Sequence, residues 1–366
     1  MKLQYRAIEG TNTKTRRLAY FTAILLALRQ NSLSEQVLLN RVIAWSQDHQ
    51  ADLYSYYAPT GEITSTRRNS ASIHYLEVAA KAKLLVPLAG MYRITRIGSV
   101  LTALMRTYQL NPNPFFLTSV EKLFYVYCLL KTDADLLLTI IDNLLERREM
   151  SLAILQQTFK ESFLKRLDNK LLSTQDAALR EQLRDRKIKV QEEWKKPERY
   201  AEHIIPPRLN WLLDLGFLEA VPFRQHHFEF IDGGRQFLSS LPRFGEFCFC
   251  DVTDQWLDLD YWKAVARTLV EIGSPVDWTG VDKETQYSLM RTILAEAFHV
   301  FRYSFVPKIS LTQIMLYLSI RVLLDHRIVA SPAVLTEWFS SARVMDGRRY
   351  EVRLSPRENE SYLIIL

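Results

Sequence analysis

The sequence is poor in residues that interrupt regular structure, with 11 glycines and 13 prolines among 366 residues. This composition excludes collagen-like and low-complexity chains. Cys128, Cys248 and Cys250 are too few for a disulfide framework. No apolar run reaches the ~18–20 residues of a membrane span, and residues 1–10 are polar and charged, unlike a signal peptide. We therefore expect a cytoplasmic protein that makes no membrane contact.

Catalytic and cofactor signatures are lacking as well. The chain has no phosphate-binding glycine loop, dinucleotide fingerprint, zinc-protease motif or serine-hydrolase elbow. Cys248 and Cys250, with His226 and His227, lack the usual spacing of zinc ligands. The acidic stretch 251–260 lacks the pattern of a two-metal nuclease. We predict a non-enzymatic protein with no cofactor and no metal.

Apolar residues instead recur mostly at helical spacing. This pattern predicts a mostly α fold with short β-hairpins, arranged as tandem winged-helix-like units. The predicted domains are residues 1–110, residues 115–245 with a charged insertion at 174–200, and residues 255–366, which end in a β-hairpin. Within the insertion, charges of both signs alternate with few apolar residues, which predicts an exposed helical arm.

Positive charge is concentrated in the first third of the chain. Residues 1–110 hold 14 Lys and Arg against 6 Asp and Glu, a net charge of +8, whereas residues 111–220 are neutral and residues 221–366 have a net charge of −2. A basic segment is typical of a surface that binds a polyanion, and the alternative is an ordinary solvated face.

The basic segment also has a recognisable order of predicted elements. Helices at 15–29, 35–47 and 69–83 precede a hairpin at 85–95. This order resembles the winged-helix superfamily, a variant of the helix-turn-helix. The resemblance implies that the third helix enters the major groove of duplex DNA, with its first turn nearest the bases.

The residue types at these positions suit DNA, because arginine binds guanine or phosphate, asparagine pairs with adenine, and serine binds phosphate. The candidate DNA contacts are Arg67, Arg68, Asn69 and Ser70 at the start of the third helix, Ser72 and Tyr75 on its outward face, Arg93 in the hairpin, and Lys14, Arg16 and Arg17 at the first helix.

A second segment also resembles a winged helix. A helix from Arg208 stops near Gly216 and is followed by strands at 218–223 and 227–231. We expect Arg208, Trp211 and Asp214 to face outward. An exposed tryptophan is typical of protein interfaces, and an aspartate repels phosphate, so we predict that this unit binds protein partners or a second copy of the chain. Whether the last third forms a third such unit is left open.

Two alternatives remain. Arg321 and His326 have the R-x4-H spacing of the HEPN ribonucleases, which the chain resembles at that one point. A kleisin-like scaffold that never touches DNA is the other alternative. The preferred hypothesis is a non-catalytic DNA-binding and adaptor subunit of a larger complex, of the plasmid-maintenance, chromosome-organising or anti-phage kind. Its partners would be duplex DNA, through the first unit, and proteins.

Overall fold

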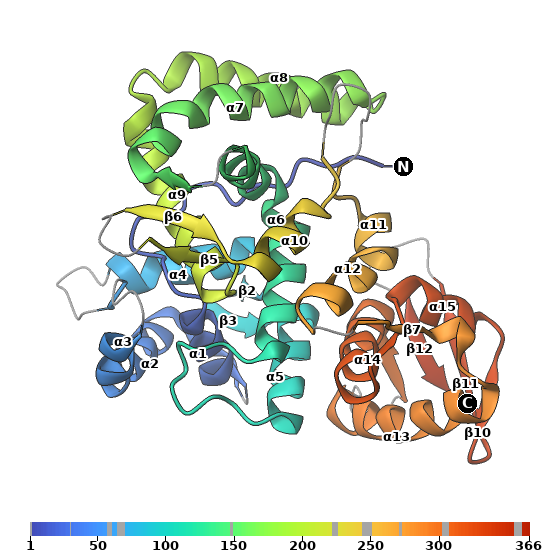
Figure 1. Ribbon diagram of the computed structural model, residues 1–366. Helices are drawn as coiled ribbons and strands as arrows, with labels where there is room; N and C mark the ends of the chain where they lie inside the picture. Colours follow the sequence, from blue (N-terminus) through green and yellow to red (C-terminus); the bar gives the residue numbers. More distant parts are fainter. Residues whose placement is uncertain are drawn as a thin grey trace. The chain divides into compact units, whose positions relative to one another are not determined.

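The computed structural model describes residues 2–29, 31–56, 61–63, 70–146, 149–221, 226–243, 251–270, 273–301, 307–354 and 361–366. These residues are mostly helical, with small and mainly antiparallel sheets, which confirms the predicted fold class at this level (Figure 1).

The chain divides into two compact units rather than three segments. Unit 1 comprises Met1–Arg93, Leu110–Thr118 and Tyr125–Asp254, and unit 2 comprises Ile94–Gln109, Ser119–Phe124 and Gln255–Leu366. The predicted domains 1–110, 115–245 and 255–366 do not coincide with this division. The reason is that the first 93 residues fold together with the middle of the chain.

The N-terminal part of unit 1 has one helix more than the sequence pattern predicts. The helix α3 (Gln50–Ser55) lies where a loop was expected, and its Leu53 is buried. Strand β1 pairs antiparallel with β3, so the sheet has the order β1-β3-β2. The remaining elements are α1 (Ala19–Leu28), β1 (Leu33–Ser34), α2 (Glu35–Asp48), α4 (Ser70–Lys81), β2 (Leu85–Leu88) and β3 (Met91–Ile94).

The middle of the chain repeats this arrangement with longer helices. The strand β4 pairs antiparallel with β6 in a sheet of order β4-β6-β5, which matches the order of the first sheet. The elements are α6 (Ser119–Leu145), β4 (Glu149–Ser151), α7 (Leu152–Ser173), α8 (Ala177–Glu193), α9 (Pro197–Asp214), β5 (Leu218–Ala220), β6 (His227–Phe230) and α10 (Asp232–Ser239).

Two of these helices are longer than predicted. The helix α6 is continuous where two helices were expected, and α9 starts at Pro197, so that Pro206 and Pro207 lie inside it. The end of α9 is as predicted: Gly216 has a φ of +72°, a left-handed conformation that glycine adopts at little cost, and the chain then enters β5.

The charged insertion is helical, but the prediction of a detached, exposed arm is wrong. The helix α8 packs along α7 (Figure 1). Its few apolar residues, Leu179, Leu183 and Val190, are all buried, and Trp194 closes the end of the contact. Few apolar residues suffice because they lie on one stripe of the helix and leave the charged residues in solvent.

Unit 2 contains a four-stranded antiparallel sheet of order β10-β11-β12-β8 and a short parallel pair, β7 and β9. The helix α14 is buried along most of its length and forms the centre of this unit. The strands β11 and β12 pair, as predicted for the hairpin at the end of the chain. The elements are α5 (Arg96–Thr107), α11 (Asp254–Leu259), α12 (Tyr261–Thr268), β7 (Val276–Asp277), α13 (Lys283–Phe301), β8 (Lys308–Ser310), α14 (Leu311–His326), β9 (Ile328–Val329), α15 (Pro332–Ser340), β10 (Arg343–Met345), β11 (Arg348–Arg353) and β12 (Tyr362–Ile365).

Candidate functional site

The predicted DNA-reading helix, α4, is largely enclosed. Ser72 and Tyr75 are buried, so the prediction that they face outward is wrong. The ring of Tyr75 packs against Tyr20 and Phe21 of α1, with centroid distances of 4.8 and 5.6 Å. Arg67, Arg68 and Asn69 lie outside the described residues, and of Ser70 the structure describes the backbone, at the start of α4.

The chain before α1 covers α4 from another side. The side chain of Asn12 lies 3.2 Å from the ring of His74, and Lys81 donates a hydrogen bond to the carbonyl oxygen of Glu9. The backbone N–H of Arg17 donates to the hydroxyl of Tyr75. A groove of DNA therefore meets this N-terminal segment before it meets the side chains of α4.

The three basic residues of that segment differ in accessibility. Lys14 is exposed and Arg16 is half-buried, with its Nε donating to the carbonyl oxygen of Thr13. Burial and the neighbouring Arg17 lower the pKa of Arg16. Arg17 is fully buried, so the prediction that it contacts DNA is wrong. Its guanidinium lies 2.7 Å from a carboxylate oxygen of Asp214, which a long sequence separation hid from the sequence pattern.

Asp214 is the centre of a buried polar cluster. Its carboxylate accepts hydrogen bonds from Arg17, from the backbone N–H of Leu18 and from the hydroxyl of Tyr56. Burial raises the pKa of Asp214 although Arg17 opposes the shift. Because Asp214 is buried, the prediction that it faces outward is wrong.

Arg208 and Trp211 also point inward, contrary to prediction. The guanidinium of Arg208 makes two hydrogen bonds to Asp133, at 2.7 and 2.8 Å. The indole N–H of Trp211 donates to the carbonyl oxygen of Thr15. The leucine face of α9 was correctly predicted to be buried, but the N-terminal segment covers its other face, which leaves no outward side between Ile205 and Asp214.

A third buried ionic cluster joins α6, α7 and the segment before α11. Asp135 lies between Arg166 and Lys170, and both cations also contact Asp251. Burial alone would raise the pKa of Asp135, but Lys170 and Arg166 hold it below its ordinary value. The backbone N–H of Arg6 donates to the same carboxylate.

Sequence reasoning missed both buried aspartates of α6. The available signal was the pair Asp133 and Asp135 inside an otherwise apolar helical stretch, since a buried carboxylate requires a partner. Their partners come from distant segments of the chain, so the sequence pattern identified the need for a cation without identifying which one.

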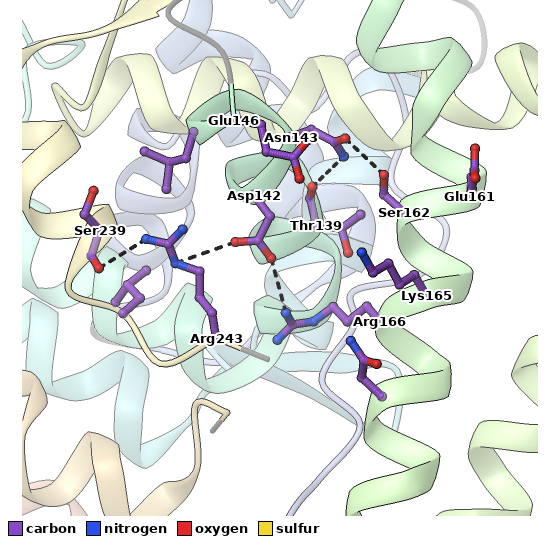
Figure 2. A pocket seen from close by; sticks show the side chains of 13 residues that line it. Thr139, Asp142, Asn143, Glu146, Glu161, Ser162, Lys165, Arg166, Ser239 and Arg243 are labelled. Atoms are coloured by element: carbon purple, nitrogen blue, oxygen red, sulfur yellow. Dashed lines mark hydrogen bonds and ion pairs between the residues drawn. The ribbon is translucent and has the colours of Figure 1, made fainter. Parts of the chain in front are cut away.

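A cavity of about 720 Å³ opens beside this cluster (Figure 2). Asp142 lies between the guanidinium groups of Arg166 and Arg243, 3.7 Å from each. Burial raises the pKa of Asp142 in spite of Arg166 and Arg243. Glu146, Glu161 and Lys165 also line the cavity, so three cations and three carboxylates balance. This balance gives no preference for a charged ligand of either sign.

The cavity also lacks the arrangement of a covalent or hydrolytic centre. The hydroxyl of Ser162 donates to the side-chain oxygen of Asn143, whose amide donates to the carbonyl oxygen of Thr139 (Figure 2). A serine nucleophile requires a neighbouring base to take up its proton, and neither partner serves as one.

The other sequence signals for chemistry have structural partners. Arg321 is buried and forms ion pairs with Glu296 and Asp325, whereas His326 is exposed at the end of α14. Asp254 pairs with Arg6. Cys248 and Cys250 lie outside the described residues. Within the described ranges, no group of three or more His, Cys, Asp or Glu side chains has the geometry of a metal site.

The predicted hairpin β2–β3 has an exposed surface of mixed character. Arg93 is exposed, as expected of a residue that reaches a phosphate. The edge strand β2, however, presents Val86, Pro87 and Leu88 to solvent, and the side chains of Val86 and Leu88 are 43% and 53% exposed. Exposed apolar residues on a hairpin are more suited to a protein contact than to a phosphate backbone.

Comparisons with known proteins add no relative: no family model, no curated protein and no solved structure matches this chain. Among the described helices, none is long and apolar enough to cross a membrane.

Proposed function

We propose that this chain is a non-catalytic adaptor subunit of a larger DNA-handling complex, in which winged-helix-like modules bind proteins. The repeated strand order of β1-β3-β2 and β4-β6-β5, each after a helix–strand–helix segment, supports two such modules in unit 1. A third in unit 2 is supported by the order of α13, β8, α14, α15, β10 and β11, with β12 between β11 and β8.

The observation that favours protein over DNA is the burial of both third helices. A winged helix that reads DNA leaves one face of this helix free to enter the major groove. Here the N-terminal segment covers α4, and α9 is buried from Ile205 onward. The ion pair of Arg17 with Asp214 fixes the N-terminal segment to α9. The modules of unit 1 are therefore building blocks of one body, and their exposed wing β2–β3 is left for partners.

The wing provides the test for an adaptor. We expect Val86→Asp with Leu88→Asp to remove a protein that co-purifies at stoichiometric amount with the tagged full chain from its own cells after crosslinking. Leu172→Asp, which adds a charge at an exposed leucine of α7, is the matched control and should retain the protein. Equal recovery with the wing variant and the control would contradict the assignment of the wing.

Duplex DNA contact by the first module is the second candidate, and the exposure of both Lys14 and Arg93 favours it. Each phosphate contact contributes about 0.9 to the slope of log affinity against log salt. If these residues bind DNA, Lys14→Gln with Arg93→Gln should lower that slope by about 2 in an anisotropy titration with a 30-base-pair duplex. The adaptor proposal expects an unchanged slope.

The ribonuclease alternative receives no support from the geometry. A guanidinium that stabilises a scissile phosphate has to be available to it, and Arg321 is buried, paired with two carboxylates and bonded to the hydroxyl of Tyr317. We therefore do not propose this activity.

A further inference from the structure

A stack of aromatic rings ends at the surface where α8 meets α9. Phe159 and Phe163 of α7 stack on Trp194, whose ring plane lies within 17° of both. Tyr200 of α9 continues the stack at an angle of 7° to Trp194, with ring centroids 5.4 Å apart. Trp194 is buried, whereas Tyr200 is 40% exposed. The last ring of the stack is thus accessible from solvent.

Tyr200 lines a cavity of about 410 Å³, which we call the elbow cavity. Its other lining residues are Glu193, Lys195, Lys196, Arg199 and His203. With histidine neutral, three cations and one carboxylate give this lining a net charge of +2. Over the described part of the chain, no ion pair joins Lys195, Lys196 or Arg199 to a carboxylate.

The helix ends beside the cavity do not oppose an anion. The carbonyl groups at the end of α8 carry partial negative charge, which would repel a phosphate. Lys160 donates hydrogen bonds to two of these carbonyl oxygens, those of Gln191 and Trp194, and so reduces this charge. The cavity therefore combines an accessible aromatic ring with unpaired positive charge.

We propose that the elbow cavity binds a nucleoside phosphate, with the base stacked on Tyr200 and the phosphate held by Lys195, Lys196 and Arg199. Every base has a π-face, and stacking on an exposed aromatic ring beside cations is the usual way in which proteins bind unpaired bases. A base inside a duplex cannot stack in this way. The source of the ligand is either a free nucleotide or a single strand of nucleic acid. This site is independent of the adaptor function.

The direct test is binding of the full chain to four probes: ATP, AMP, a fluorescein-labelled dA12 single strand and the corresponding dA12·dT12 duplex. Calorimetry reports on the nucleotides and anisotropy on the oligonucleotides. We expect binding of the single strand in preference to the duplex, or of the free nucleotides. Saturable binding of ATP or AMP assigns a free nucleotide, whereas binding of dA12 alone assigns a strand. Failure of the wild-type chain to bind any unpaired probe would overturn the proposal.

Two substitutions of Tyr200 test the stacking interaction. Tyr200→Leu should raise the dissociation constant of the bound probe by about 5- to 100-fold, the range for loss of one base–aromatic stack. Tyr200→Trp should keep or improve binding, because it retains a ring. Thermal unfolding of both variants shows that each is folded. Unchanged affinity in folded Tyr200→Leu would overturn the proposal, as would equal losses in Leu and Trp variants of equal stability.

A matched pair of triple variants tests the phosphate contacts. Lys195→Gln with Lys196→Gln and Arg199→Gln should weaken the probe and lower the salt slope for dA12 by about 0.7 for each lost contact. The control replaces Arg180, Arg184 and Lys189, which are exposed residues of α8 outside the cavity, with glutamine. Both triples lower the net charge by the same amount. Equal weakening by the two triples would show unspecific attraction and would contradict the site.

Discussion

Two segments of unit 1 contain positive charge in opposite circumstances. The first 110 residues have a net charge of +8, yet Arg17 within them is fully buried and paired with Asp214. Residues 111–220 have a net charge of zero, yet Lys195, Lys196 and Arg199 gather around one cavity. The segment with the higher net charge is therefore not the one with the more obvious anion site.

The difference shows that pairing and burial decide whether a cation is available. A buried arginine interacts with its carboxylate at short range in a medium of low dielectric constant, so it is fixed in place. Exposed lysines without a neighbouring carboxylate remain free to bind a phosphate. Net charge along the sequence averages over both situations, and it identifies neither.

The largest expected effect comes from separating these two roles within the first segment. Arg17→Met should destabilise the fold by about 3 kcal/mol, because it leaves Asp214 buried without its cation. The hydrogen bonds from Tyr56 and Leu18 remain, and the raised pKa of Asp214 eases its protonation, which limits the loss. Urea unfolding of unit 1, followed by tryptophan fluorescence, measures this free energy.

Lys14→Met is the matched control, because Lys14 is an exposed cation of the same segment. We expect it to change the free energy of unfolding by less than about 0.5 kcal/mol. Similar effects of the two substitutions would mean that Arg17 does not have the structural role described above.

The second largest effect is expected in the helix that was predicted to be an exposed arm. Leu183 of α8 is fully buried, so Leu183→Ala should cost about 2–4 kcal/mol, from lost apolar burial and from the cavity that remains. Ile188→Ala, at a half-exposed position of the same helix, is the control and should cost much less. A stability change below about 0.5 kcal/mol for Leu183→Ala would restore the detached-arm interpretation.

A smaller effect should follow from breaking an exposed pair. Lys187 of α8 and Asp168 of α7 form an ion pair whose side chains are both accessible to solvent. Such pairs contribute ~0–1 kcal/mol, since water screens the attraction and two long side chains lose freedom. Lys187→Ala should therefore change the unfolding free energy by less than about 1 kcal/mol. A loss as large as that for Arg17→Met would show that exposure does not separate the two kinds of pair.

The sequence predicts local structure in this chain better than it predicts faces. The positions of α1, α2, α4 and the hairpin β2–β3 follow from apolar spacing and from the turn at Ala89 and Gly90. The direction of Trp211 was misjudged, because the leucine face of α9 predicts one buried side and gives no information about the N-terminal segment on the other.

The elbow cavity was visible in part. The stretch from Trp194 to Tyr200 alternates aromatic and basic residues, which is a recognised pattern for nucleic-acid contact, but its charged surroundings resembled a solvated helix. The stacking of Trp194 on Phe159 and Phe163 depends on the pairing of α7 with α8, which residue spacing within either helix does not determine.

The smallest predicted effect concerns the one carboxylate of the elbow cavity and sharpens the comparison between net and local charge. Glu193→Gln raises the charge of the lining from +2 to +3. At a separation of about 8 Å in water, one charge contributes roughly 0.5 kcal/mol, so a bound nucleoside phosphate should bind about twofold more tightly. Glu181→Gln changes the net charge of the chain equally, but it lies more than three turns away on the same helix. It should therefore leave the affinity unchanged. Because salt screens exposed charges within about 10 Å at 0.1 M, the twofold gain should shrink as salt is added. An equal gain in both variants would show that the cavity responds to net charge alone.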